Sequence, residues 1–404
     1  MKILIISQYH PPEMGAAASR WSDYAIILSR QGHSVTVIAE IPNYPSGIVP
    51  QRYKKKWFVK EQDPTNTYSI IRTAVWANSR KTNIQRIGFY LSFMFSSALI
   101  GLKLRRSDLI IVSSPPLFVG LSGVVISRLK KTPMIFDIRD LWPESAKVLG
   151  EITSGIILNF AERMEKTIYK HSSGYLLAVP GFSNYLTKEY PFTLFKGFTN
   201  LMNGVSQSFF ENVVNIDIHE NKFFTVLYSG NIGLAQELKV VILSAILLKD
   251  YPINFQIIGD GVQRKTLEKM TADHLLKNVK FIDPMPRKEL ITYIKSASVC
   301  LVPLKKSPLF LNAIPSKLLE YMACGKPVIV GIRGEVENLV KKSDAGLCIE
   351  PEEERALSEA IITYYQNKNL RVYQGENGQK YIKQHYVKEN LMENAMIEIK
   401  KILK

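Results

Sequence analysis

Cysteine, histidine and paired aspartates are scarce in this chain, and their scarcity narrows the possible chemistry. The three cysteines, Cys300, Cys324 and Cys348, are odd in number and lack zinc-ligand spacing, so they are predicted to be buried free thiols in a reducing compartment. The six histidines are scattered, with no pair at helical or strand spacing, and the eleven aspartates form no Asp-x-Asp motif. We therefore expect no bound metal ion and no other cofactor.

Long hydrophobic runs are also missing. The apolar stretch over residues 87–102 is shorter than the ~20 residues that a membrane-spanning helix needs. It is predicted to form a helix that is buried or rests on an interface. The apolar run before Pro11 and Pro12 is too short for a secretory signal. The expected location is the cytoplasm, with peripheral contact to the inner face of the cytoplasmic membrane left open.

Acidic residues are outnumbered by basic ones. The chain has 36 Asp and Glu against 52 Lys and Arg, a net charge of +16. Such a balance suits nucleic acid, an anionic membrane or a phosphate-rich substrate. No helix-turn-helix, RNA-recognition or zinc pattern supports nucleic acid. Segment 51–60, QRYKKKWFVK, mixes basic and aromatic residues, which suits an anionic membrane surface; a solvated loop is the alternative.

Two successive series of strand and helix patterns organise the chain. Short apolar runs alternate with helical patterns from residue 3 to 179, and the alternation restarts at residue 223. This is the pattern of doubly wound parallel sheets. The predicted fold is α/β, with two Rossmann-like domains that face a central cleft. The predicted domains are 1–198 and 199–374, with C-terminal helices over 375–404 that pack back toward the first domain.

Small-residue turns follow several of the predicted strands. Gly15 and Ala16 open a helix after the first strand, and Gly230 with Asn231 does so in the second domain. Gly259 and Gly261 follow the next strand. Small side chains let backbone N–H groups and a helix N-terminus approach a phosphate. The spacing is not that of the dinucleotide fingerprint, and tight packing is the alternative for each turn.

The segment IPSKLLEYMACGKPVIV carries the most information about a ligand. Pro315 and Ser316 suit a helix start, and Gly325 followed by Pro327 suits its end. Lys317 and Glu320 are three positions apart and share a helix face. A cation near a helix N-terminus opposes the dipole, which favours a diphosphate beside Lys317. Glu320 then suits a ribose diol; an exposed Lys–Glu pair is the alternative.

Charged residues beside a tryptophan follow a strand of the first domain. The segment DIRDLWPES contains Arg139, Asp140, Trp142 and Glu144 just past the strand predicted over 133–138. Ligands in open parallel sheets bind beyond the carboxyl ends of strands. These residues are interpreted as one wall of the cleft, with a structural cluster of salt bridges as the competing interpretation.

The order of these motifs resembles a known family. The motifs are QYHPPE, PNYPSG, SSPPLFVG and RDLWPES in the first domain, and NGV, YSGNIGLAQ, IIGDG, PSKLLEYMACGKPVI and AGLCIEP in the second. Over nearly its whole length the sequence resembles family 4 of the retaining GT-B glycosyltransferases. Within that family it is most similar to the amino-deoxysugar transferases of O-antigen and capsule assembly, of the L-fucosamine type.

The resemblance implies two substrates, each bound by a different domain. The second domain would bind a nucleotide-sugar donor, with UDP as the expected nucleotide, and the first domain a polyprenyl-diphosphate-linked sugar acceptor. Glu320 matches the family glutamate that holds the donor ribose. The partner glutamate eight positions earlier is replaced by Asn312, which fits a modified donor sugar. Arg139 stands where many relatives have histidine, and arginine is not a proton shuttle.

The resemblance also implies a mechanism without an enzymic nucleophile. In retaining transfer of this kind, the leaving diphosphate itself takes the acceptor proton. Lys317, Arg139 and Asp140 are the expected catalytic residues. Donor-binding contacts are expected from Gly15, Ala16, Gly230, Asn231, Gly259, Gly261, Asn312, Ser316, Lys317 and Glu320, and acceptor contacts from Trp142 and Glu144.

Two other functions stay open at this point. Non-hydrolysing UDP-sugar epimerases also have the GT-B fold, but they need acid and base groups around the sugar, and few histidines lie near the strand-end motifs here. A basic nucleic-acid-binding protein is suggested by charge alone. Product analysis without an acceptor separates the first alternative, and the salt dependence of duplex binding separates the second.

Overall fold

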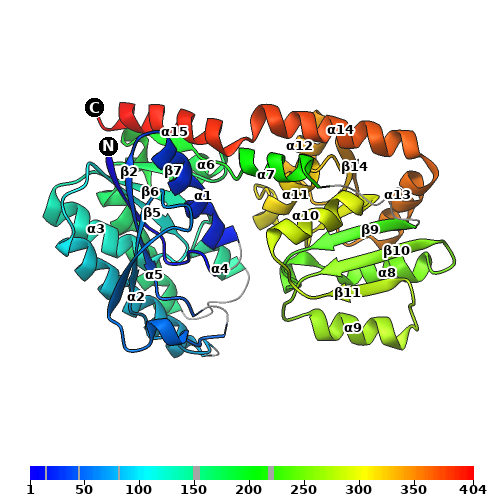
Figure 1. Ribbon diagram of the computed structural model, residues 1–404, viewed down its shortest axis with the longest axis horizontal. Helices are drawn as coiled ribbons and strands as arrows, with labels where there is room; N and C mark the ends of the chain where they lie inside the picture. The colour runs from blue at the N-terminus through cyan, green and yellow to red at the C-terminus, as the bar shows by residue number, and fades with distance from the viewer. Residues whose placement is uncertain (14–15, 44–45, 81, 149–154, 217–222) are drawn as a thin grey trace. The chain divides into compact units, whose positions relative to one another are not determined.

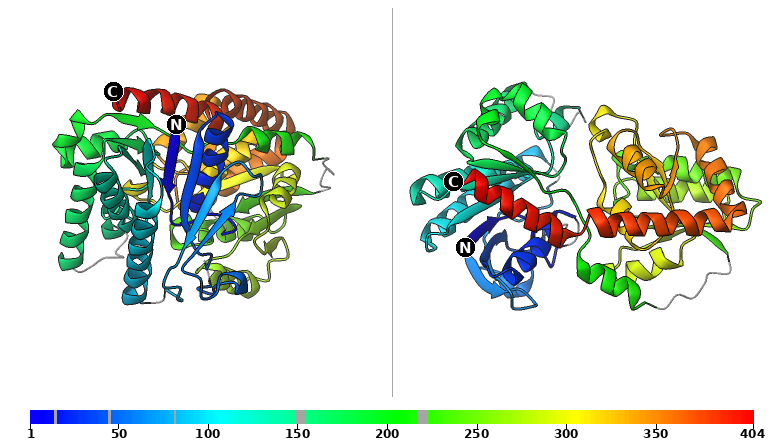
Figure 2. Two further views of the ribbon diagram at one scale, coloured as in Figure 1. Left: turned by 60° about the vertical axis from the view of Figure 1, so that its left-hand side comes forward. Right: turned by 90° about the horizontal axis from the view of Figure 1, so that it is seen from above.

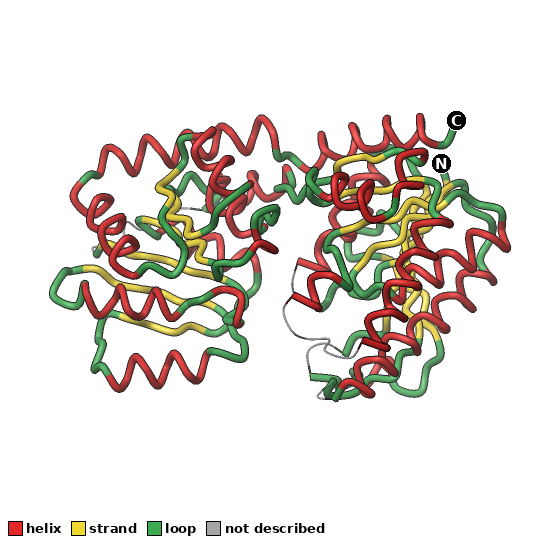
Figure 3. Tube along the Cα trace, turned by 180° about the vertical axis from the view of Figure 1, so that it is seen from behind, coloured by secondary structure: helices red, strands yellow, loops and turns green. Residues whose placement is uncertain are grey.

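The computed structural model describes the chain except for residues 14–15, 44–45, 81, 149–154 and 217–222. It divides into two compact units. The first contains Met1–Met202 and Glu389–Lys404, and the second contains Asn203–Lys388. Each unit is a sheet covered by helices, as Figure 1 and Figure 3 show. The predicted fold class, two Rossmann-like α/β domains, is confirmed.

The sheet of the first unit has eight strands. They are β1 (Lys2–Ile6), β2 (Ser34–Glu40), β3 (Phe58–Gln62), β4 (Ser69–Thr73), β5 (Leu109–Ser114), β6 (Met134–Ile138), β7 (Gly174–Leu177) and β8 (Phe198–Asn200). Their order is β3-β4-β2-β1-β5-β6-β7-β8, with β3 antiparallel to β4. The central strands β5 and β6 are buried along their whole length, which is why they appear as continuous apolar runs.

Helices cover both faces of this sheet. They are α1 (Ala16–Arg30), α2 (Asn83–Lys103), α3 (Phe118–Lys130), α4 (Glu144–Val148), α5 (Gly155–His171), α6 (Phe182–Glu189) and α15 (Lys388–Ile402), with short turns η1 (Gln51–Tyr53) and η2 (Pro191–Phe195). Helices α1 and α15 contribute to one core cluster. Helices α2, α3, α5 and α6 contribute to the core on the opposite face, and α3 packs against both α2 and α5.

A buried ion pair fixes α1 to the sheet. Arg20 Nη2 lies 3.0 Å from Asp137 Oδ1 in β6, and both side chains are almost wholly buried. The indole N–H of Trp21 donates to Asp137 Oδ2 at 2.7 Å, and Ser113 Oγ donates to the same oxygen at 3.0 Å. Arg20 also donates to the carbonyl of Leu201. Buried charges persist where they are paired and hydrogen-bonded in this way.

The sheet of the second unit has six parallel strands. They are β9 (Phe224–Ser229), β10 (Ile253–Ile258), β11 (Val279–Ile282), β12 (Val299–Pro303), β13 (Val328–Gly331) and β14 (Gly346–Cys348). Their order is β11-β10-β9-β12-β13-β14. In chain order this is 3-2-1-4-5-6, the Rossmann order, and the direction of progression reverses between β9 and β12.

The helices of the second unit complete the α/β layers. They are α7 (Gln207–Val214), α8 (Lys239–Leu247), α9 (Arg264–Asp273), α10 (Arg287–Ser296), α11 (Ser316–Ala323), α12 (Glu335–Ser343), α13 (Glu354–Gln366) and α14 (Lys368–His385), with short turns η3 (Leu234–Gln236) and η4 (Pro308–Phe310). Cys300 and Cys324 are buried free thiols, and the thiol of Cys348 is partly buried.

The predicted return of residues 375–404 to the first domain is wrong in part. Helix α14 packs on α11, α12 and α13 and therefore belongs to the second unit. Only the segment from Glu389 returns, and α15, coloured red in Figure 2, buries Met392, Met396 and Ile399 in the core of the first unit. The other boundary lies after Met202 and not after residue 198.

Candidate functional site

The turn after β9 lies at the switch point of the second sheet, where ligands of such sheets bind. Its first residue, Gly230, has φ +129°. A Cβ at this position would lie 2.8 Å from Lys317 Nζ and 3.2 Å from Lys317 Cε. The backbone conformation therefore favours glycine, and the end of the Lys317 side chain lies directly over this residue. The structure thus brings together two predicted site residues, Gly230 and Lys317.

The ammonium group of Lys317 is held against a tyrosine. Lys317 Nζ donates to Tyr228 OH at 2.7 Å and lies 3.9 Å from the centre of the Tyr228 ring. The Tyr228 hydroxyl in turn donates to the carbonyl of Asn231 at 2.6 Å. Burial lowers the pKa of Lys317 to about 7, and the nearby Glu320 opposes this shift. The lysine has lost much of its water, so an anion bound beside it would favour its charged form.

Helix α11 is tied to the end of β9 by a buried tyrosine. Ser229 N–H donates to Tyr321 OH at 2.7 Å, and the two hydroxyl groups lie 2.9 Å apart. Tyr321 is fully buried. The helix begins at Ser316 after Pro315, and Pro315 makes no side-chain cap. Because Tyr321 anchors the helix, its first turn with Ser316 and Lys317 is fixed at the carboxyl end of the sheet.

The carboxylate of Glu320 pairs with an arginine that sequence reasoning missed. Arg287 Nη2 donates to Glu320 Oε1 at 2.7 Å, and the two side chains are 37% and 20% exposed. The Arg287 guanidinium also lies 4.8 Å from the centre of the Phe209 ring. Arg287 is the first residue of α10, a position that carries no motif. The pair orients Glu320 and leaves part of it open to solvent.

The glycines after β10 serve loop packing. A Cβ on Gly259 would lie 1.9 Å from the carbonyl oxygen of Gly230, and one on Gly261 would lie 2.4 Å from that of Ile232. The predicted amide donors already have partners within the protein. Gly230 N–H donates to the carbonyl of Ile258, Gly259 N–H to that of Ile282, and Gly261 N–H to Asp260 Oδ1. These glycines bring the two turns together.

Two predicted asparagine contacts lie on exposed turns. Asn231 is exposed, and its Nδ2 lies 3.4 Å from Gln236 Oε1. Asn312 is exposed in the turn between η4 and α11. That turn is fixed to the start of α12, because Glu335 N–H donates to the carbonyl of Leu311 at 2.7 Å. Asn312 therefore has a defined backbone position with an accessible side chain.

The predicted residues of the first unit lie just beyond β6. Asp140 Oδ2 accepts a hydrogen bond from Ser145 Oγ at 3.0 Å, and loss of water around the carboxyl group raises its pKa. Burial, and then the charge of Arg20, lower the pKa of Arg139 to about 10. Trp142 packs against the core, and Glu144 lies 3.9 Å from Lys147. Gly15 lies outside the described residues, and Ala16 begins α1.

A buried carboxyl cluster in the first unit was not predicted. Glu40, the last residue of β2, is fully buried, and burial followed by the charge of Glu13 raises its pKa well above the ordinary value. Gln8 Nε2 and Asn43 Nδ2 donate to its two oxygens at 2.7 and 2.9 Å. Glu13 accepts from the Asn43 N–H at 2.9 Å. Glu13 and Asn43 stand within the QYHPPE and PNYPSG motifs, which were the available signal.

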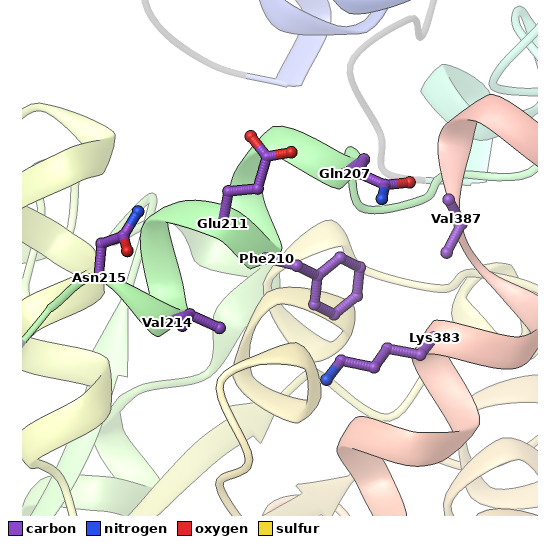
Figure 4. Close-up of a pocket in the computed structure, with 7 residues that line it drawn as sticks. All are labelled: Gln207, Phe210, Glu211, Val214, Asn215, Lys383 and Val387. Carbon is purple, nitrogen blue, oxygen red and sulfur yellow. The ribbon is translucent and has the colours of Figure 1, made fainter.

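Two cavities lie apart from the Lys317 region. One of about 710 Å³ in the first unit is lined by residues that include Glu144, Glu165 and Tyr190. Burial raises the pKa of Glu165 to about 7, and its carboxylate accepts from Tyr169 and Tyr190. The other, of about 460 Å³, lies between α7 and α14 of the second unit and is lined by residues that Figure 4 labels, with Phe210 at its centre. Neither includes a predicted donor contact.

Metal ligands and membrane spans were sought in the part of the chain that the structure describes. There, no three His, Cys, Asp or Glu side chains are grouped so as to hold a metal ion. No helix of the same residues has the length and apolar character needed to cross a bilayer. Catalysis without a metal ion stays a prediction.

Comparison with known proteins matches this chain to glycosyltransferases. Residues 211–381 match the family model of the group 1 glycosyl transferases. The chain is 26% identical to the Escherichia coli glycosyl transferase WcaI, which is named for colanic acid biosynthesis, over 89% of this chain and 91% of WcaI.

Solved structures share the fold. Sucrose-phosphate synthase from Thermosynechococcus elongatus superposes with a TM-score of 0.71 at 19% identity, covering 100% of this chain and 98% of that one. The Anabaena protein HepE, solved in complex with UDP, has a TM-score of 0.69 at 12% identity and covers 99% and 100%. By these matches the chain is a glycosyltransferase with the GT-B fold, and residues 211–381 of its second unit match the group 1 glycosyl transferases.

Proposed function

We propose that this enzyme moves a sugar from a nucleotide diphosphate donor to a lipid-linked glycan during surface polysaccharide synthesis, with retention of configuration and without a metal ion. The observation that carries the proposal is Lys317, which lies over Gly230 at the switch point of the second sheet. The relative named for colanic acid biosynthesis and the UDP complex of HepE support the substrate classes. UDP is the proposed nucleotide, and an amino-deoxy sugar the proposed group transferred.

The donor would be held by the first turn of α11 and its neighbours. The diphosphate binds beside Lys317 and Ser316, where the helix N-terminus adds positive potential. Glu320 accepts hydrogen bonds from the ribose hydroxyls, and Arg287 keeps its carboxylate oriented. Asn312 donates to a sugar hydroxyl from its exposed turn. A fixed cation and a helix terminus thereby replace the metal ion that other transferases use.

The proposed chemistry needs no protein nucleophile. The bond between the anomeric carbon and the diphosphate oxygen breaks while the acceptor oxygen bonds to that carbon from the same face. The acceptor proton passes to a phosphate oxygen of the leaving group. Lys317 acts by stabilising the negative charge that grows on the diphosphate. Charge stabilisation by groups already in position is the protein's main contribution to the rate.

The first unit would hold the acceptor. Arg139 supplies a cation for the acceptor diphosphate, because its pKa of about 10 keeps it charged at neutral pH. Asp140, oriented by Ser145, faces the incoming hydroxyl, and Trp142 and Glu144 contact the glycan. Contact of segment 51–60 with an anionic membrane would bring this unit to a polyprenyl-linked substrate.

Donor choice can be tested by thermal shift with UDP-, GDP- and ADP-sugars in the presence of a chelator. Stabilisation by one nucleotide series is expected, and Lys317→Met should abolish most of it. Lys265→Met, at an exposed position of α9 in the same unit, is the control and should keep the shift. If the donor stabilised both variants equally, Lys317 would not be part of the donor site. Epimerisation of the donor sugar without any acceptor would favour the epimerase alternative.

A further inference from the structure

Helix α2 of the first unit is apolar on both of its long faces. It has 21 residues and is therefore about 30 Å long. Its inward face buries Phe89, Phe93 and Ile100. On its outward face Ile84 is 78% exposed, Phe95 61% and Leu99 50%. A surface helix normally turns polar residues to water, so this outward face requires another explanation.

The outward residues form one stripe. Ile84, Ile87, Leu91, Phe95, Leu99 and Leu102 recur every three or four residues, which places them on one side of the helix. Leu91 and Leu102 are partly exposed and also pack against the core. The stripe therefore runs the length of the helix without a charged residue. Contiguous exposed apolar surface of this kind marks a contact site.

Aromatic side chains from outside the helix extend the stripe. Trp76 is 52% exposed, and a Cβ on Gly88 of α2 would lie 2.2 Å from its ring. Phe58 of β3 is 53% exposed and pairs directly with Thr73. The hydroxyl of Thr73 accepts a hydrogen bond from Ser96 of α2. Since directly paired residues share a sheet face, Phe58 lies on the α2 side.

We define the α2 face by these exposed apolar residues. It consists of Phe58, Trp76, Ile84, Ile87, Phe95 and Leu99. All six belong to the first unit.

Basic residues border the α2 face. Arg86 lies in the first turn of α2, and Lys103, Arg105 and Arg106 follow its C-terminal end, all exposed. Lys60 lies on β3, two residues from Phe58 and on the same side of that strand. Helix α2 itself contains no Asp or Glu. An apolar stripe with tryptophan at one side and basic ends is the composition of a helix that lies in the plane of an anionic membrane surface.

We propose that the α2 face docks the enzyme on an anionic lipid bilayer, with α2 lying along the interface. The charge decides between this occupant and a second copy of the chain. The protein carries a net charge of +16, and a symmetric self-contact through this face would bring the two basic borders together. Anionic headgroups complement the same border. The claim assigns a surface of the first unit to the membrane contact in the proposed function, and it rests on that function for the nature of the acceptor.

Vesicle co-sedimentation tests the α2 face directly. The wild-type protein should bind vesicles of phosphatidylcholine with phosphatidylglycerol and leave pure phosphatidylcholine vesicles largely unbound. The double variant Phe95→Ser with Leu99→Ser should lower the partition coefficient roughly tenfold or more, because two apolar anchors are lost. The matched control is Phe223→Ser with Leu247→Ser in the second unit, where the side chains are 58% and 50% exposed. This control should bind as the wild type does.

Further readouts separate the possible failures. Lys103→Glu with Arg105→Glu should abolish the preference for anionic vesicles, and added salt should weaken wild-type binding. Equal loss in both apolar double variants, or wild-type binding that ignores lipid charge, would overturn the proposal. The proposal would also be overturned if the wild-type protein formed dimers and did not bind vesicles, and if the double variant Phe95→Ser with Leu99→Ser were monomeric. Thermal shift with the donor tests the proposed function separately, and the α2-face variants should keep it.

Discussion

Each of the two units contains an arginine–carboxylate pair, and the two pairs differ in how many of the hydrogen bonds that the carboxylate can accept come from the protein itself. In the first unit, Asp137 and Arg20 are almost fully buried, and the carboxylate also accepts from Trp21 and Ser113. In the second, Glu320 and Arg287 are 20% and 37% exposed. Asp137 has no capacity left for a ligand, whereas Glu320 does. A charged pair has a structural role when all of its hydrogen bonds are made within the protein. It is a candidate for ligand binding when some of its hydrogen-bonding capacity is left open to solvent.

The same contrast separates neighbours in the sequence. Asp137 and Asp140 are three residues apart in one motif, yet the first is in a buried strand and the second lies beyond its end. The motif DIRDLWPES therefore contains both a structural carboxylate and a functional candidate. The interpretation as a structural cluster holds for Asp137, and the interpretation of Asp140 as part of a cleft wall stays a prediction.

The largest expected effect is on the stability of the first unit. Asp137→Asn should lower its free energy of unfolding by about 3–5 kcal/mol, because Arg20 would be left as an uncompensated buried charge. All four tryptophans, Trp21, Trp57, Trp76 and Trp142, lie in the first unit. Tryptophan fluorescence in urea therefore reports that unit alone.

Glu320→Gln is the matched test in the second unit. The pair with Arg287 is partly exposed, so its loss should change stability by no more than about 1 kcal/mol. The tryptophan-monitored transition should not move at all. If Asp137→Asn lowered the free energy of unfolding as little as Glu320→Gln does, the number of hydrogen bonds made within the protein would not separate a structural pair from a ligand-binding pair.

The second largest effect is on catalysis. Lys317→Ala removes a fixed group that stabilises the leaving diphosphate. It should therefore raise the activation barrier by about 2.7–4 kcal/mol, which lowers kcat roughly a hundredfold to a thousandfold. Radiolabelled sugar transfer measures the loss. Folding should be unaffected, since Gly230 beneath the side chain keeps its backbone bond to Ile258. A kcat equal to that of the wild type would remove Lys317 from the chemistry.

Much of the fold followed from sequence patterns. The strand predicted over 133–138 corresponds to β6, and the helix predicted to start at Ser316 and to end before Gly325 corresponds to α11. Long apolar runs between helical patterns are strong local signals. The edge strand β3 was missed because its residues alternate between partly buried and exposed, and three of the five are polar.

The site was less accessible to sequence reasoning. Lys317, Glu320 and Gly230 were found because they stand in motifs at a strand end or a helix start. Tyr228 and Arg287 were not, because their roles depend on tertiary contacts with residues far along the chain. For Gly259 and Gly261 the sequence left phosphate binding and tight packing open, and the structure shows the close approach of their two turns. Spacing alone does not distinguish these roles.

The third effect is on donor affinity. Glu320→Gln should raise the donor KM by about tenfold, as expected for weakening a hydrogen bond between a charged carboxylate and the ribose. Arg287→Met should raise KM less and leave kcat close to the wild type, because it only frees Glu320 to rotate. Steady-state kinetics with the best donor from the thermal-shift screen measures both. A larger loss for Arg287→Met than for Glu320→Gln would mean that Arg287 itself contacts the donor.

The smallest effect is a pH dependence of donor binding, which tests the role given to Lys317 in the second unit. The folded-state pKa of Lys317 is about 7, below its ordinary value of 10.5, so the ammonium form is lost as pH rises through 7. Free protein should therefore bind the donor about fivefold more weakly at pH 8 than at pH 7, as one titrating group requires. Isothermal titration calorimetry at the two pH values measures this ratio.

The same shift has the opposite sign for stability, which makes the assignment testable twice. Between pH 7 and 10.5 the unfolded chain keeps a proton on Lys317 that the folded protein has released, so the second unit should become more stable as pH rises across this window. Lys317→Met should remove both trends together, because a single group causes them. If Lys317→Met still bound the donor measurably and its affinity still fell between pH 7 and pH 8, another group would carry the positive charge. Lys317 would then not be the cation of the donor site.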